Sequence, residues 1–303
     1  MKKLLIASTA LVATAGMAAA DITVTGHAAA GYHSGLDGKG VATASATDTG
    51  IYSNVGVDFT MSGATDGGLT FGASLNIDAG TEIDQGNFEF DGSDAGTAGL
   101  GNVNISSAAG TITFDNAGID NLFDSDYASH DVSISTTING IAVNAAFDAD
   151  DSVAGVAGTA ADADMSASLA YTSGSLTTTL TGSNHAADGM ATKLAVSYVV
   201  NDMLTVGGNT KTLAAAGSDA VTGVNATVVA NGFTITASSD NSASGGDWDL
   251  DLGYVLSGTT LAYGTDENDA WAATASRSLG GGATVQAGLN WEDSMYAGIS
   301  FAF

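Results

Sequence analysis

The stretch ATVQAGLNWEDSMYAGISFAF, residues 283–303, carries the pattern that decides the fold. From Ala283 to Trp291 the odd positions hold Ala, Val, Ala, Leu and Trp, whereas the even positions hold Thr, Gln, Gly and Asn. From Met295 to Phe303 the odd positions are apolar again. Side chains of a β-strand alternate between two faces, so this period of two predicts two strands that are apolar on one face.

The same alternation recurs along the chain, for example in residues 69–78 and 247–256. A soluble β-sandwich would show it too, with the apolar face turned to a core. However, the polar face here carries almost no Lys or Arg, and strands of about nine to eleven residues match a tilted membrane span. Aromatic residues also gather near strand ends, as in the girdle of a membrane barrel. These observations favour an all-β transmembrane antiparallel barrel over a sandwich.

The N-terminus has the features of a secretory signal peptide. Lys2 and Lys3 precede a short apolar stretch, Leu4–Met17, and Ala18–Ala20 fits a small-residue cleavage site. Such a segment is removed on export. We therefore expect residues 1–20 to be a signal peptide and residues 21–303 to form a single barrel domain.

Composition excludes several classes of partner. The chain has 33 Asp and Glu against 6 Lys and Arg, a net charge of −27, and neither Cys nor Pro. So large an acidic excess repels nucleic acid and acidic lipid headgroups and favours small cations. After the N-terminal segment no window of about 18 residues is continuously apolar. A membrane protein without helices must close its strands into a barrel that faces lipid.

Tight turns and longer connections alternate, which predicts the architecture. Eight short turns are expected at 62–68, 107–110, 137–140, 172–175, 200–202, 230–232, 256–258 and 279–282. Longer, acidic connections fall at 36–50, 80–99, 116–129 and 149–163. Short turns at the periplasmic end and long loops at the extracellular end are typical of outer-membrane barrels of Gram-negative bacteria. Eight turns imply eighteen strands, or sixteen if one weak hairpin is merged with its neighbours.

Three segments carry a family resemblance: FTMSGATDGGLTFGASL at 59–75, LGGGATVQAGL at 279–289 and DITVTGHAAAGY at 21–32. They resemble the general diffusion porins of Rhodobacter-type alphaproteobacteria. The resemblance implies passive diffusion of small hydrophilic solutes and ions across the outer membrane. It also implies a homotrimer of sixteen-stranded barrels, each with a third loop folded into the lumen, usually acidic and facing a basic wall.

Carried over to this chain, strands at Asn102–Ser107 and Thr111–Asp115 would precede a third loop at Asn116–Ser129. The acids expected in this constriction loop are Asp115, at its root, and Asp120, Asp124 and Asp126. The basic wall is nearly absent, because only four cations remain beyond Lys3: Lys39, Lys193, Lys211 and Arg277. This departure from the family pattern predicts a weak transverse field.

Alternation places several charged residues on the polar, lumen-facing side. We expect the pore lining to include Asp58, Asp78, Lys193, Asp247, Asp249 and Asp251. Lining acids raise the local concentration of cations, so the sequence predicts a pore that prefers cations. The alternative is that these acids are merely hydrated residues of the wall.

The chain also ends on the alternating residues Ile299, Phe301 and Phe303. An aromatic C-terminus on such a strand resembles the terminal signal that the barrel-assembly machinery reads. We therefore expect that machinery to be a partner of the chain during biogenesis.

Other functions have less support. The four histidines, His27, His33, His130 and His185, are scattered and no catalytic motif accompanies them, so neither enzyme activity nor a required cofactor is expected. Loop acids could hold Ca²⁺ or Mg²⁺, with candidates at Asp150, Asp151, Asp162 and Asp164 or at Asp266, Glu267 and Asp269. A non-conducting structural or adhesive barrel and a secreted calcium-binding β-protein remain alternatives.

Overall fold

The computed structural model describes residues 20–36, 49–86, 88–125, 129–149, 165–185, 189–212, 219–242 and 246–303. These residues form eighteen strands: β1 (Ala20–Ser34), β2 (Thr49–Ala64), β3 (Thr70–Asp84), β4 (Glu89–Ser107), β5 (Gly110–Ile119), β6 (His130–Ile138), β7 (Ile141–Phe147), β8 (Met165–Ser173), β9 (Leu176–His185), β10 (Gly189–Asn201), β11 (Leu204–Thr212), β12 (Val221–Ala230), β13 (Phe233–Asp240), β14 (Asp247–Leu256), β15 (Thr259–Asp266), β16 (Trp271–Gly280), β17 (Ala283–Asn290) and β18 (Met295–Ala302). The expected signal peptide lies, except for Ala20, outside the described residues.

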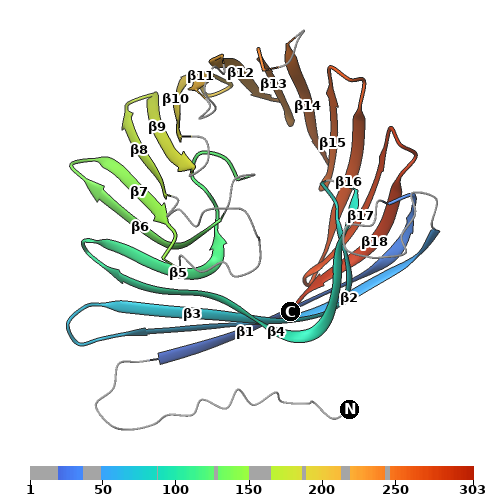
Figure 1. Ribbon diagram of the computed structural model, residues 1–303. Helices are drawn as coiled ribbons and strands as arrows, with labels where there is room; N and C mark the ends of the chain where they lie inside the picture. Colours follow the sequence, from blue (N-terminus) through green and yellow to red (C-terminus); the bar gives the residue numbers. More distant parts are fainter. Residues whose placement is uncertain are drawn as a thin grey trace.

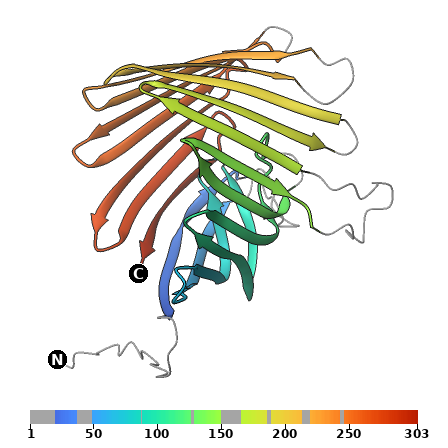
Figure 2. The same cartoon turned by 90° about the vertical axis from the view of Figure 1, so that its left-hand side faces the viewer.

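The strands form one closed antiparallel barrel (Figure 1). Each strand pairs with the next along the chain, and β1 pairs with both β2 and β18. Closure pairs every strand with two neighbours, so the wall satisfies its backbone within the sheet wherever the strands are in register. The strands run obliquely across the wall (Figure 2). Within the described ranges no helix is long and apolar enough to cross a membrane.

The number of strands corrects the sequence-based expectation. The sixteen strands implied by the family resemblance are wrong, because the barrel has eighteen. Merging a hairpin was the error: all eight expected turns join two strands that pair with each other. None of these hairpins can be merged without breaking a ladder of hydrogen bonds.

Apolar and polar side chains separate between the two faces of the wall. Large apolar residues on alternate positions are exposed, for example Leu169 and Tyr171 on β8 and Trp248 on β14. In an outer-membrane barrel this outward face is buried by lipid rather than by a protein core. The opposite face holds small and polar residues, and the connection between β5 and β6 folds over it inside the ring (Figure 1).

The main buried apolar cluster lies inside the ring. It joins Tyr52 of β2 and Tyr296 of β18 to residues near the β3–β4 turn and to the end of β1; its members are Leu36, Tyr52, Ile83, Phe88, Phe90 and Tyr296. The predicted long loop at 80–99 is therefore wrong, since β3 continues to Asp84 and β4 begins at Glu89. Apolar residues in an acidic stretch let it fold as a hairpin that packs on the wall.

Candidate functional site

The acids of β14 lie on the inner face of the wall. Asp249 and Asp251 are exposed and alternate with Leu250 and Leu252. Asp249 accepts a hydrogen bond from Ser238 Oγ of β13 at 3.2 Å and is the cross-strand partner of Asp266 on β15. Asp247 lies nearer the end of the strand, opposite Asp240, where its carboxylate accepts a bond from Ser242 Oγ. The alternation thus brings five acids onto the neighbouring strands β13, β14 and β15.

A second pair of acids lies on β2 and β3 and contacts a histidine of β1. Asp58 and Asp78 lie on the inner face and bracket one imidazole: His27 Nδ1 is 3.5 Å from Asp58 Oδ2, and His27 Nε2 is 3.4 Å from Asp78 Oδ1. Asn76 Nδ2 donates to Asp78 Oδ2 at 2.5 Å. His27 therefore lies between these two acids and links β1 to β2 and β3, a contact that was not expected from the sequence. The signal that could have revealed it is that all three residues have polar-face parity.

Basic residues contribute little to the inner face. Lys193 on β10 and Lys211 on β11 are cross-strand partners, and both alternate with outward-facing positions. Arg277 is exposed on the outward face, opposite Thr259 and close to the β16–β17 turn, where a long side chain can reach the interface. Of the Lys and Arg residues that the structure describes, two face the lumen.

The β5–β6 connection turns inward and packs against the wall. Asp115 lies in the middle of β5, next to the point where its pairing with β6 becomes irregular, whereas Asp120 is exposed and Asp124 is half-buried. Asp126 lies outside the described residues. Between the two acids Asn121 and Phe123 are buried. The connection is thus held by its neutral residues, and its described acids are not brought onto the acidic strands β2, β3 and β14.

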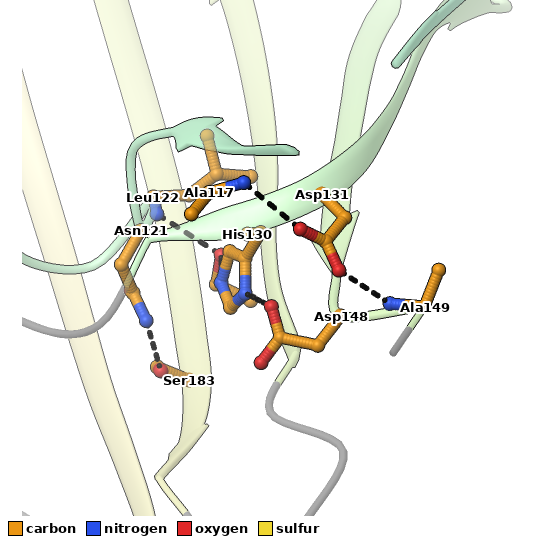
Figure 3. Close-up of polar contacts among 9 residues, drawn as sticks. Ala117, Asn121, Leu122, His130, Asp131, Asp148, Ala149 and Ser183 are labelled. Carbon is orange, nitrogen blue, oxygen red and sulfur yellow. Dashed lines mark hydrogen bonds and ion pairs between the residues drawn. The ribbon is translucent and has the colours of Figure 1, made fainter. Parts of the chain in front are cut away.

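A polar clamp fixes this connection (Figure 3). Asn121 Nδ2 donates to Ser183 Oγ of β9 at 3.0 Å, and Leu122 N donates to Ser166 Oγ of β8 at 3.0 Å. At its root the carboxylate of Asp131 accepts from Ala117 N at 2.9 Å and from Ala149 N at 3.1 Å. The clamp consequently ties four segments that are far apart in sequence.

His130 completes the clamp as a fully buried side chain. Its Nδ1 lies 3.2 Å from Asp148 Oδ1, and its Nε2 lies 3.0 Å from Ser166 Oγ. This order of Asp, His and Ser is that of a catalytic triad. Here Ser166 is 1% exposed and already accepts the Leu122 amide, so no substrate can approach its hydroxyl. The arrangement instead gives the buried side chains of the clamp, Asn121, His130, Ser166 and Ser183, hydrogen-bond partners in a connected chain. No local sequence pattern indicates this arrangement, because the three residues lie on separate strands or strand ends.

The C-terminal residues close the barrel against the first strand. Gly26 N donates to Phe303 O at 3.2 Å, and Phe303 N donates to Gly26 O at 2.7 Å. Phe301 and Phe303 stack with ring centroids 6.3 Å apart, and both rings are exposed on the outer face. Ile299 lies on the same face of β18 and is half-buried. The expected terminal signal is thus displayed outward.

The proposed metal-binding acids fall into two groups. Asp150, Asp151, Asp162 and Asp164 lie outside the described residues. Asp266 is described, and its Oδ1 accepts backbone bonds from Asn268 N at 2.8 Å and Ala270 N at 3.1 Å, which orders the β15–β16 turn. Within the described ranges no three His, Cys, Asp or Glu residues are arranged to hold a metal ion.

Comparisons with known proteins agree with this architecture. Among solved structures, a quintuple mutant of the Rhodopseudomonas blastica porin has a TM-score of 0.56 at 16% identity, and a triple mutant has 0.55 at 17% identity. Each match covers 93% of this chain and 100% of the other, which supports the fold. No curated protein sequence matches significantly. The family model described as Gram-negative porin matches residues 7–295. The chain therefore belongs to the Gram-negative porin family, the outer-membrane barrels through which solutes diffuse passively.

Proposed function

We propose that this porin prefers cations and that the acids of its inner face set the preference. Membership of the family makes the chain a non-enzymatic channel, but the sign of its selectivity is a finer property. The observation that carries the proposal is the imbalance of charge on the lumen face. Asp58, Asp78, Asp249 and Asp251 lie there, against Lys193 and Lys211 as the described basic residues.

The two lysines also occupy only one part of the lumen wall. They are neighbours on β10 and β11, so their positive charge is concentrated on one arc of the ring. Exposed acids occupy β14 on one side, and the half-buried acids Asp58 and Asp78 occupy β2 and β3 on another. Charges of one sign that line a low-dielectric channel concentrate counter-ions along it. A permeating anion would therefore meet repulsion along most of the circumference.

The test is planar-bilayer recording of purified, folded protein under a KCl gradient. Discrete steps with a reversal potential of the sign set by K⁺ flow are expected. Exchanging Asp249 and Asp251 for Asn should lower the cation preference without closing the channel. Steps that show no cation preference would leave the porin in place and reject the acidic lining as its selectivity determinant. Protein that is folded but gives no steps would favour the non-conducting structural barrel instead.

We further propose that the protein assembles as a homotrimer through the barrel-assembly machinery after residues 1–20 are removed. The outward display of Phe301 and Phe303 on the last strand supports recognition by that machinery. Chemical crosslinking of outer membranes should give a threefold ladder, and N-terminal sequencing of the membrane form should begin at Asp21.

A further inference from the structure

The β3–β4 hairpin leaves the barrel wall before it turns. Pairing of β3 with β2 ends at Gly80, and pairing of β4 with β5 begins only at Val103. Between these points the two strands pair with each other, and their register shifts three times. Gly80 has a φ of 104°, which favours glycine. Bulges bend a strand and re-aim it, so this series directs the hairpin away from the wall.

The hairpin tip packs inside the ring. Phe88 contacts Tyr296 of β18 with ring centroids 5.4 Å apart, and Phe90 meets His33 of β1 edge-on at 4.6 Å. Phe88 and Phe90 are 3% and 6% exposed. Ala272 of β16 also packs against this cluster. Burial of aromatic side chains against the inner wall gives the hairpin a fixed position rather than that of a solvated loop.

The wall is shaped to receive these aromatic rings. Tyr52 lies over Gly31 and Gly298, and Tyr296 lies over Gly288. A Cβ on Gly31 would be 2.6 Å from Tyr52 Cε1, and a Cβ on Gly288 would be 2.6 Å from Tyr296 Cε1. Glycine at these strand positions permits close approach of a ring at some conformational cost. These glycines leave room in the wall for the two tyrosine rings on which the hairpin packs.

A slot remains between the tip and the wall strands β14–β17. It is a cavity of about 330 Å³ bordered by Gly86 and Phe88 on the hairpin side. Its wall side carries four acids, Asp249, Asp251, Asp266 and Glu292. The described residues that line the slot include no Lys, Arg or His. The hairpin thus approaches the same acids that the cation proposal invokes.

We propose that the β3–β4 hairpin is a constriction element of this pore and that cations are selected in the slot beside its tip. The inference rests on the proposed cation preference but goes beyond it, because it names the narrow passage. In this arrangement the β5–β6 connection is clamped to the wall of β8 and β9, while the hairpin narrows the lumen beside β14–β17. Low-dielectric aromatic surface next to carboxylates strengthens the field that an ion meets.

The cross-strand pairing shows where the tip of the hairpin can be deleted without disturbing the barrel wall. Gly80 and Asp94 are partners, so replacing Thr81–Ser93 with Asn-Gly closes the shortened hairpin by a two-residue turn. A second variant, Phe88→Ser with Phe90→Ser, keeps the full hairpin and removes its anchors. The exposed Gln85→Ser on the same turn is the matched control. Heat-modifiable gel mobility verifies that each variant is folded.

Single-channel conductance and the sugar-size limit for liposome swelling report the constriction. The deletion should raise conductance about twofold or more and admit larger sugars, because the pore cross-section limits flow. The serine pair should raise conductance or make it fluctuate, and Gln85→Ser should leave it unchanged. Asp249→Asn with Asp251→Asn should reduce cation preference strongly in the full chain and weakly in the deletion variant, a coupling that a double-mutant cycle measures.

Two results would overturn the inference. If the folded deletion variant has the conductance and size limit of the parent, the hairpin does not constrict the pore. If conductance is unchanged but the trimer dissociates, the hairpin contacts a neighbouring copy instead of the lumen. By contrast, a parent channel without cation preference refutes the proposed selectivity itself, so the two failures can be told apart.

Discussion

At the residue scale, His130 shows how buried, hydrogen-bonded side chains hold the β5–β6 connection against the wall. The imidazole is fully buried, yet both nitrogens have partners, and the serine it contacts also holds the Leu122 amide. Buried polar groups of this kind are expensive when one partner is lost. The position of the β5–β6 connection therefore depends on a few side chains of the wall rather than on its own length.

Removing the serine hydroxyl tests this dependence. Ser166→Ala leaves His130 Nε2 and Leu122 N without a partner, so it should lower the free energy of unfolding by about 1–3 kcal/mol. It should also release the connection and increase current noise. Urea unfolding in detergent and bilayer recording provide the two measurements. Ser168→Ala, two residues along the same face of β8, should change neither; equal effects of both variants would argue against the clamp.

The glycines beneath the aromatic rings give a second residue-scale prediction. In Gly288→Ala the new methyl group would meet the Tyr296 ring, and overpacking of this kind typically costs about 1–3 kcal/mol of unfolding free energy. Gly253→Ala is the matched control, because its Cβ would have an ordinary 3.6 Å contact with Thr234 Cβ. Urea midpoints compare the two. A Gly288→Ala midpoint equal to that of the parent would show that the ring does not need the glycine.

At the scale of elements, the sequence predicted the turns better than the long connections. All eight turns were correct, because Gly, Asn and Ser at fixed places impose local geometry that needs no distant partner. The β3–β4 hairpin was missed because its acidic, glycine-rich stretch reads as a loop. Ile83, Phe88 and Phe90 were the available signal, since a solvated loop has no need of three large apolar side chains.

The candidate site likewise has features that the sequence predicted and features that it did not. Alternation alone placed Asp249, Asp251 and Lys193 on the inner face, because parity is a local property of a strand. The clamp of His130, Asp148 and Ser166 and the bracketing of His27 could not be predicted. They depend on the register between strands and on where a connection folds, which the pattern within one strand does not contain.

The last strand offers an element-scale prediction about assembly. Phe303 holds β1 through backbone bonds to Gly26, while its exposed ring is free to be read by another protein. Phe303→Ala should therefore keep the refolded barrel stable and reduce the amount that reaches the outer membrane several-fold. Refolding yield in detergent and outer-membrane fractionation separate the two effects. A loss of stability in vitro together with normal assembly in cells would assign the ring a structural role instead.

At the scale of the whole molecule, charge is distributed along the length of the chain rather than placed at one point. The excess of 33 acids over 6 basic residues gives the protein a net charge of −27, and acids recur on separate arcs of the inner wall. A field built in this way acts through solution and is therefore open to screening. A site that selected ions by direct coordination would respond much less to ionic strength.

Salt dependence distinguishes these two modes of selection. The Debye length falls from about 10 Å at 0.1 M salt to about 3 Å at 1 M, so the ratio of K⁺ to Cl⁻ permeability should decline steeply over that range. Lys193→Glu with Lys211→Glu should raise the ratio in dilute salt, because the described cations of the lumen are then replaced by acids. In concentrated salt the same variant should approach the parent. Reversal potentials at a fixed concentration ratio and rising mean salt provide the measurement. A ratio that stayed constant would mean that ions are selected by direct coordination to carboxylates, not by the electrostatic field of the acids in the slot and along the wall.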